Sequence, residues 1–382
     1  MKTFKQAKFS FTKEHTAVAK GIAILVMFYH HLFVIEERIH CDYIPLLKFA
    51  GHDWQTPLAY FCKICVGTYV FLSGLGLYYS TQRIPADRRV GKTWLAILKK
   101  LCSFYLNYWV IFLLFVPLGF LVTEREFDKT LFWQAFFGLS TGKYNGEWWF
   151  VQTYLVLLLL FPLLAWFVRS SKPAIWLVKG ILAVVLIKGW HIFETAALEN
   201  QGLLIVRGMI ALTWPWIPVF LVGILCAKFD VYGRMRYFLY KRRIKPKPIC
   251  LLVLLVVFVV RVCITKSPVD AQLDYLLAPL FVFASTTLLM GTRLSPLFQL
   301  LGKHSMNMWL THTFWCYYYF QPLVFWPKIS VLVLVWLTVL SLLTSWVINL
   351  INEPLQKLLK SVGSRSQMKT REIQSNSAYS TL

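Results

Sequence analysis

Long apolar runs separated by short polar segments recur along almost the whole chain. An apolar stretch of about 20 residues is the length at which an α-helix crosses a lipid bilayer. The pattern therefore predicts an all-α, polytopic membrane helix bundle of about ten transmembrane helices. The expected spans are residues 15–35, 57–80, 103–122, 148–168, 174–193, 203–227, 248–265, 271–290, 296–321 and 329–351. The apolar segment 130–142 is too short to span, so we expect it at the membrane interface or re-entering the membrane.

Polar segments at either end divide the chain into three parts. Residues 1–14 are basic with interleaved phenylalanines, and we expect them on the cytoplasmic membrane surface. Residues 15–355 form the transmembrane domain. Residues 356–382 hold too few apolar side chains to bury a core, which predicts a disordered cytoplasmic tail.

The net charge of +23 would suggest nucleic-acid binding in a soluble protein, but its distribution indicates membrane topology instead. With a cytoplasmic N-terminus, the predicted inner segments hold most of the Lys and Arg residues and the outer loops hold few. This is the positive-inside pattern of multi-pass membrane proteins. It places both termini in the cytoplasm and predicts a lipid bilayer, not nucleic acid, as the partner of the basic residues.

The eight cysteines fall mostly inside apolar spans and need not indicate disulfides. Cys62 and Cys65 are a lone Cys-x-x-Cys pair, with Lys63 between them and no second ligand pair. A structural zinc site needs four ligands. We interpret the pair as small residues at a helix contact and predict no metal site.

Lys20 and His31 are eleven residues apart in the first predicted span. Such a step is three helical turns plus about 20°, so both side chains share one stripe, about 16 Å apart along the axis. His30 is rotated by about 100° and does not share that stripe. Ionisable groups inside a bilayer are costly and often mark a substrate path. The alternatives are a lysine that extends to the interface and a histidine that bonds a neighbouring helix.

The predicted topology separates the ionisable groups into two zones. Lys20 lies near the inner face, whereas His31, Arg261 and His312 lie toward the outer half of the membrane. A basic entrance on one side and a polar cavity on the other suit a reaction that joins a cytoplasmic anion to an external acceptor.

Five short motifs follow one another in an order that resembles the acyltransferase-3 family of bacterial integral membrane O-acyltransferases. They are Lys20 and His31 with ten residues between them, Phe71-Leu72-Ser73-Gly74, Glu147-Trp148-Trp149-Phe150-Val151, Leu301-Gly302-Lys303-His304-Ser305 with Trp309-Leu310-Thr311-His312, and Glu353-Pro354. The resemblance covers most of the chain and favours His31 over His30 as the histidine of the family's first motif.

The sequence departs from the family at the inner end of the third helix. The family commonly has an Arg-x-x-Arg pair there, whereas this chain has Lys99 and Lys100, with Ser103 at the second basic position. Lysine is a point charge and lacks the guanidinium group with which arginine makes two parallel hydrogen bonds to a phosphate. The phosphates of the family's acyl donor would therefore be bound with a different geometry here.

The resemblance implies transfer of an acyl group, most often acetyl, from cytoplasmic acyl-CoA to a hydroxyl of a surface or periplasmic glycan. It implies a multi-pass protein of the bacterial plasma membrane, with acyl-CoA as co-substrate and no resident cofactor. On this basis His31 is the general base or the transient acyl acceptor. The candidate catalytic residues are His31, Glu147 and His312; the candidate donor-binding residues are Lys20, Ser73, Lys99, Lys100 and Arg261; the candidate acceptor-binding residues are Trp148 and Trp149.

Other functions remain as alternatives. A transporter or a flippase for a glycan or glycolipid would also place polar residues along a bilayer path, but it would favour two related halves, and the sequence has no such repeat. A glycan polymerase or ligase would need a large polar outer loop, whereas the longest predicted outer loops here are residues 36–56 and 123–147. A membrane O-acyltransferase of the other superfamily would have a different pattern of His and Asn residues. The sequence is compatible with a monomer and with an oligomer.

Overall fold

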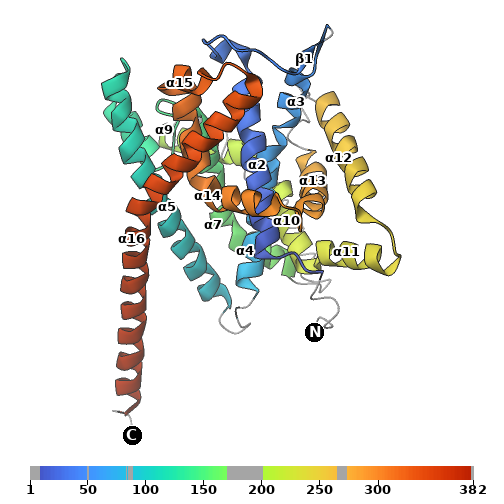
Figure 1. Cartoon of the computed structure of the whole chain (residues 1–382). Helices are drawn as coiled ribbons and strands as arrows, with labels where there is room; N and C mark the ends of the chain where they lie inside the picture. Colours follow the sequence, from blue (N-terminus) through green and yellow to red (C-terminus); the bar gives the residue numbers. More distant parts are fainter. Residues whose placement is uncertain are drawn as a thin grey trace.

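The computed structural model describes residues 9–49, 51–82, 84, 89–169, 201–264 and 273–379. In these residues the fold is an α-helical bundle with one small antiparallel sheet of two strands (Figure 1). Its helices are α2 (Lys13–Phe33), α3 (Gln55–Phe61), α4 (Ile64–Thr81), α5 (Arg89–Val122), α6 (Lys129–Phe136), α7 (Trp149–Arg169), α9 (Gln201–Thr213), α10 (Ile217–Phe229), α11 (Val231–Lys241), α12 (Pro246–Cys263), α13 (Asp274–Leu289), α14 (Ser295–Thr313), α15 (Gln321–Phe325) and α16 (Ser330–Tyr379).

Short elements complete the fold. They are the 3₁₀ turns η1 (Glu36–Arg38), η2 (Gly146–Trp148) and η3 (Trp214–Trp216), the π-helical turn η4 (Phe314–Tyr318), and the strands β1 (Lys48–Phe49) and β2 (His52–Asp53). The strands, α3 and α15 lie at one end of the bundle, which we call the loop end (Figure 1). Helix α2 begins and α16 ends at the opposite end, which we call the terminal end.

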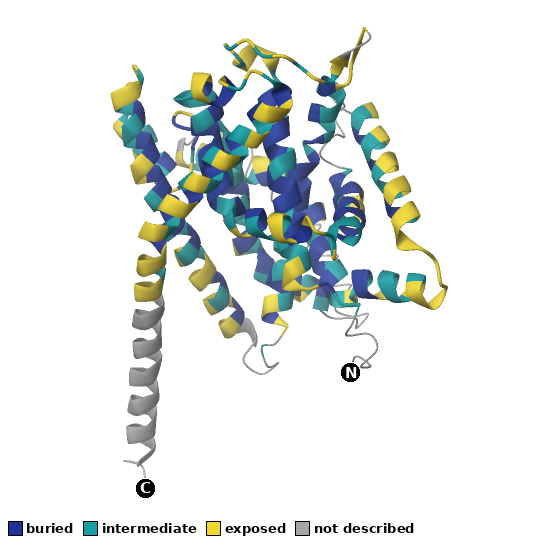
Figure 2. Cartoon of the chain, in the orientation of Figure 1, coloured by how far each residue is buried: buried dark blue, intermediate teal, exposed yellow. Residues whose placement is uncertain are grey.

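Seven helical segments among the described residues are long and apolar enough to cross a membrane. They are Lys13–Phe33, Gln55–Thr81, Gly91–Val122, Gly146–Arg169, Gly202–Phe229, Pro246–Cys263 and Ser330–Leu359. The chain is thus all-α and multi-pass, as its apolar runs predict. Large apolar residues are exposed on several of these helices. Figure 2 shows the exposed residues of α12 along one side of that helix.

Three predicted spans differ from this set. The predicted span 174–193 lies outside the described residues. Helix α13 has 16 residues and is shorter than the others. The predicted span 296–321 corresponds to α14 followed by the π turn η4, and α14 carries polar side chains that face neighbouring helices instead of lipid.

Two further segments have structures that their apolar patterns alone do not specify. The segment 130–142 contains the eight-residue helix α6, whose last carbonyls accept hydrogen bonds from aromatic side chains of α5. Tyr108 donates to the Ala135 carbonyl at 2.6 Å and Trp109 to that of Phe136 at 2.9 Å. At the other end of the chain, α16 runs as a helix to Tyr379, through the residues where low apolar content predicts disorder. No proline follows Pro354 there, and Lys, Leu, Gln, Met and Arg favour a helix.

Helices α2 and α14 cross with their backbones in direct contact. A Cβ on Gly21 would collide with the Phe298 carbonyl of α14, and a Cβ on Gly302 would collide with the Ala17 carbonyl of α2. Small residues that let backbones approach are typical of helix contacts in membranes. Gly302 belongs to the Leu301-Gly302-Lys303-His304-Ser305 motif, so the glycine of that motif serves the helix contact.

Helices α4 and α10 form a second pair of the same kind. A Cβ on Gly74 would collide with the Phe220 carbonyl of α10, and a Cβ on Gly223 would collide with the Phe71 carbonyl of α4. Gly74 ends the Phe71-Leu72-Ser73-Gly74 motif. The two glycine-mediated pairs hold α2, α4 and α14 in fixed positions, because α2 also packs against α4.

Amide side chains join α16 to α5 and α14. Asn107 on α5 donates to Asn307 on α14 at 2.8 Å and accepts from Asn352 on α16 at 2.6 Å. Asn307 in turn donates to Asn349 on α16 at 2.8 Å. These bonds explain why α14 tolerates polar residues, since its amides are bonded inside the bundle and away from lipid.

The Gly74 contact yields a matched pair of variants on one helix. Gly74→Ala forces α4 and α10 apart, and overpacking of this kind costs about 1–3 kcal/mol of stability. Gly76→Ala is the control, because a Cβ there meets nothing within 4 Å. We expect thermal unfolding of the purified protein in detergent to show a lowered Tm for Gly74→Ala and an unchanged or raised Tm for Gly76→Ala. Equal Tm values for both variants would contradict the close backbone contact.

Candidate active site

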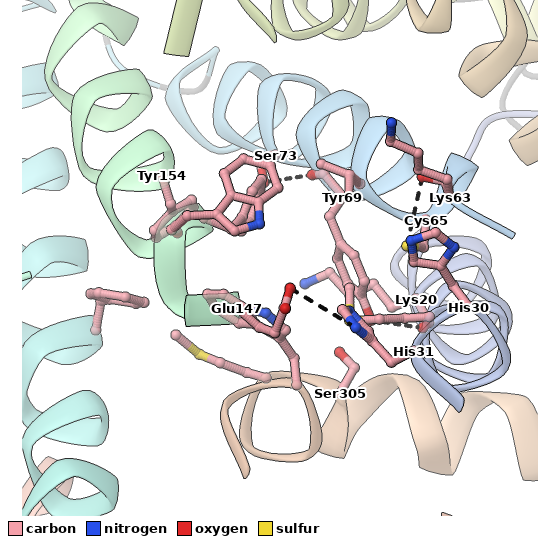
Figure 3. Close-up of a pocket in the computed structure, with 17 residues that line it drawn as sticks. Lys20, His30, His31, Lys63, Cys65, Tyr69, Ser73, Glu147, Tyr154 and Ser305 are labelled. Atoms are coloured by element: carbon pink, nitrogen blue, oxygen red, sulfur yellow. Dashed lines mark hydrogen bonds and ion pairs between the residues drawn. The ribbon is translucent and has the colours of Figure 1, made fainter. Parts of the chain in front are cut away.

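A cavity of about 230 Å³ lies between α2, α4, α7 and α14 (Figure 3). The polar residues in its lining are Lys20, His30, His31, Lys63, Tyr69, Ser73, Glu147, Tyr154 and Ser305. Aromatic, apolar and sulfur-containing side chains from α2, α4, α5, α7 and α14 form the rest of the wall.

Lys20 and His31 line this one cavity, at different levels of α2. The eleven-residue spacing sets the distance between them along the helix at about 16 Å. No carboxylate lies within ion-pair distance of Lys20 in the part of the chain that the structure describes. Lys100 on α5 lies within electrostatic range of it. The cavity thus has a cationic end near Lys20 that is not neutralised by a nearby acid.

His31 is held by contacts to three other elements. Its Nδ1 lies 3.9 Å from Oε2 of Glu147, on η2 (Figure 3). The Tyr317 hydroxyl, from η4, donates a hydrogen bond to the His31 carbonyl. The rings of His31 and His312 lie 5.0 Å apart. These contacts leave the imidazole facing both the cavity and a carboxylate that can orient it.

Glu147 is fixed by the loop end of the bundle. The Asn145 side chain accepts a hydrogen bond from the Glu147 backbone N–H at 3.1 Å, which orders the turn η2. Arg38 on η1 donates from Nη1 to Glu147 Oε1 at 2.6 Å. Burial lowers the pKa of Arg38, but the hydrogen bond and the charge of Glu147 outweigh it, so the pKa lies above its ordinary value. Glu147 therefore joins a cation on one side to the imidazole on the other.

The sequence pattern does not single out Arg38. It lies in the loop after the first span, seven residues beyond His31. A cation so close to the end of that span is the available signal, but the sequence does not show which acid it meets.

His312 supports His31 from outside the cavity. It is fully buried, and its Nδ1 donates to the Trp309 carbonyl at 2.6 Å, which assigns the proton to that nitrogen. Its Nε2 has no hydrogen-bond partner among the described residues, and its ring stacks on Phe28 at 5.0 Å. The structure thus places His312 beside His31 and not in the cavity lining.

His30 also lines the cavity, although the helical geometry predicts that it lies off the stripe of Lys20 and His31. The cavity is wide enough to reach the neighbouring face of α2. His30 Nδ1 donates to the Ala59 carbonyl of α3 at 2.8 Å. This bond ties His30 to a structural partner, whereas His31 faces Glu147.

The serines of the two motifs line the cavity beside their glycines. Ser73 donates to the Tyr69 carbonyl at 2.7 Å, and Ser305 donates to the Gly302 carbonyl at 3.0 Å. Their hydroxyl protons are therefore used within their own helices, and their oxygens remain available as acceptors. In each motif the glycine makes the helix contact and the serine faces the cavity.

The structure separates the two candidate tryptophans. Trp149 lines the cavity, and its ring lies 6.1 Å from that of Trp216. Trp148 is fully buried and donates from Nε1 to the Leu310 carbonyl at 2.9 Å. Trp148 therefore packs η2 against α14, and only Trp149 is placed to meet a ligand.

The structure places Arg261 apart from the candidate donor-binding residues Lys20 and Ser73. This arginine is fully buried between α12 and α13, and its Nη1 lies 2.9 Å from Oδ1 of Asp274. Gly67 on α4 provides the space for that carboxylate. Arg261 does not line the cavity, because a buried guanidinium needs its acid partner and Asp274 lies outside the cavity wall. Lys99 and Lys100 lie exposed on α5 and do not line the cavity either.

A search of curated proteins and a search of solved structures each find no match. A search against protein-family models matches the acyltransferase-3 family, described as an acyltransferase domain, over residues 17–350. The match begins within α2, ends within the first half of α16 and contains the whole cavity described above. The cavity, its motif serines and the first four of the five motifs are thus parts of one family domain, and the chain belongs to the acyltransferase-3 family.

Proposed function

We propose that this membrane acyltransferase moves an acyl group, acetyl in the first instance, from acyl-CoA to a sugar hydroxyl of a surface or periplasmic glycan. The observation that carries the proposal is the single cavity with the Lys20 ammonium at one level and the His31–Glu147 pair at another. The family supports acyl transfer; the donor, the acyl group and the acceptor are the proposal.

The terminal end of the bundle is the proposed side of donor binding. The positive-inside pattern favours a cytoplasmic location for this end, in the bacterial plasma membrane. Lys20 and the nearby Lys100 supply cations for the phosphates of CoA, and the exposed Lys99 adds a third at the same end of α5. The pantetheine arm would follow the α2 stripe past Ser73 and Ser305, whose oxygens accept hydrogen bonds from its amides.

The proposed chemistry takes place at His31. The imidazole removes the proton from a sugar hydroxyl whose oxygen attacks the thioester carbonyl carbon. A carbon–oxygen ester bond forms, the carbon–sulfur bond breaks, and the proton passes to the CoA thiolate, which leaves as the free thiol. Glu147 orients the ring and stabilises the imidazolium that forms during transfer. If His31 instead accepts the acyl group, the same atoms balance over two steps and the label stays on the protein between them.

Incubation with radiolabelled acetyl-CoA tests the proposal. Wild-type protein and His31→Ala would each be reconstituted in liposomes, with an added glycan extract. We expect free CoA and labelled glycan from the wild type and neither from the variant. Well-folded wild-type protein that neither binds nor turns over acetyl-CoA would contradict the proposed function.

The two adjacent histidines provide a matched comparison. We expect His31→Ala to reduce the rate of transfer by at least about 100-fold, because general-base catalysis contributes roughly 10²–10⁴. We expect His30→Ala to retain much of the activity, since its Nδ1 is bonded to Ala59. The initial rate of labelled ester formation at equal protein levels is the measurement, and equal loss in both variants would count against the assignment.

Lys20→Ala tests donor binding. Removal of an unpaired cation from a phosphate site should raise KM for acetyl-CoA roughly ten-fold, because hydrogen bonds to charged groups contribute about 1.5–3 kcal/mol. We expect KM for the acceptor to change much less. Steady-state kinetics with each substrate varied in turn is the measurement, and an unchanged KM for acetyl-CoA would remove Lys20 from the donor site.

A further inference from the structure

A second cavity lies beside the first at the loop end of the bundle. It has a volume of about 320 Å³ and is lined by Glu37, Arg38, His40, Tyr317 and Tyr318. It shares no lining residue with the cavity that holds His31. We call it the outer cavity.

Two contacts connect the outer cavity to the catalytic pair. Arg38 Nη1 bonds to Glu147 Oε1 at 2.6 Å, and the Tyr317 hydroxyl bonds to the His31 carbonyl. The Arg38 guanidinium also lies 5.1 Å from the centre of the Tyr317 ring. Arg38 and Tyr317 thus form a wall one side chain thick between the outer cavity and the residues proposed to act on the acceptor.

The lining of the outer cavity indicates the chemistry of its ligand. It combines a carboxylate, an imidazole, a guanidinium and two phenol rings, and the described residues of its wall include no aliphatic side chain that would suit a lipid tail. Glu147 already neutralises Arg38, and the Glu37 carboxylate disfavours an anion. Hydrogen-bonding groups beside aromatic rings suit an uncharged, polyhydroxylated ligand. The volume lies at the small end of the range for ligand sites, about 300–1,000 Å³.

We infer that the outer cavity binds the acceptor, and that the acceptor presents an uncharged sugar unit there. This inference rests on the proposed acyl transfer. The Arg38 side chain is 44% exposed, so it is free to move off Glu147 when the sugar binds. A sugar hydroxyl that does not react then takes the place of the guanidinium as the donor to Glu147. The reacting hydroxyl lies next to His31, which removes its proton.

Two exposed residues of the lining give variants that leave the helices intact. Glu37→Ala and His40→Ala each remove one hydrogen-bonding group from the outer cavity. The bond from the His40 backbone N–H to Gln321, at 2.7 Å, does not depend on the His40 side chain. Glu36→Ala and His52→Ala are the matched controls, because both residues are exposed in the same loop region and neither lines the outer cavity.

The assay uses protein in liposomes, radiolabelled acetyl-CoA and defined acceptors. The acceptors are the methyl glycosides of glucose, galactose and N-acetylglucosamine, with methyl glucuronide as the anionic counterpart. We expect acetylation of neutral glycosides in preference to the glucuronide. We expect Glu37→Ala and His40→Ala to raise KM for those glycosides roughly two- to ten-fold, the effect of one hydrogen bond. Glu36→Ala and His52→Ala should leave KM for both substrates unchanged.

Three results would overturn the inference. They are preferred acetylation of the glucuronide, His31-dependent hydrolysis of acetyl-CoA with no glycoside acetylated, and control variants that raise the acceptor KM as much as Glu37→Ala and His40→Ala. A protein that neither hydrolyses acetyl-CoA nor transfers its acetyl group would instead overturn the proposed function. The two failures are therefore distinguishable in one assay.

Discussion

The contact between the backbones of α2 and α14 is the constraint on which the rest of the site depends. Gly21 and Gly302 leave no room for a Cβ, so the two helices have one distance and one register. In a bilayer the hydrophobic effect does not bring helices together, and close packing and interhelical hydrogen bonds must do so. The contact sets the α2 face that carries Lys20 and His31 opposite the α14 face that carries Ser305. A cavity in a membrane bundle thus owes its shape to residues that have almost no side chain.

The electrostatic arrangement at the loop end depends on three segments far apart in the sequence. Arg38 follows α2, Glu147 precedes α7 and Tyr317 follows α14. A carboxylate that is only 17% exposed would be costly without a partner; here the Arg38 guanidinium compensates the charge of Glu147, and the His31 imidazole lies on its other side. The same weak screening that makes isolated charges costly strengthens the orientation of His31 by Glu147. The contacts of Glu147 with Arg38 and His31 therefore both stabilise the loop end and orient the proposed catalytic imidazole.

The sequence predicts the features that follow from local geometry. The step from Lys20 to His31 places both on one side of α2 whatever surrounds the helix, and the motif serines lie one residue (Ser73) or three residues (Ser305) from glycines that must face a neighbour.

Features that depend on tertiary contacts cannot be predicted from the sequence in this way. Trp148 and Trp149 are neighbours with equal side chains, and only the packing of η2 on α14 decides which one is enclosed. The sequence does not show that Arg261 pairs with Asp274, because this acid belongs to the following helix. The polar residues of α14 are not typical of a lipid-facing helix. They are accommodated because its Asn307 side chain is hydrogen-bonded to α5 and α16.

The contacts made by the π-helical turn η4 depend on the exact number of residues in this part of the chain. Its backbone bond from the Tyr319 N–H to the Phe314 carbonyl, at 2.9 Å, encloses one residue more than an α-helical turn. That extra residue lets Tyr317 point to α2 while Tyr318 accepts the Gly146 N–H beside η2 at 2.9 Å. Loss of a single residue between positions 314 and 318 would restore α-helical spacing and rotate everything after it by about 100°. A deletion there would break the hydrogen bonds of Tyr317 to His31 and of Tyr318 to Gly146, although both tyrosines were still present. The function of this turn therefore depends on its register and not only on its amino-acid composition.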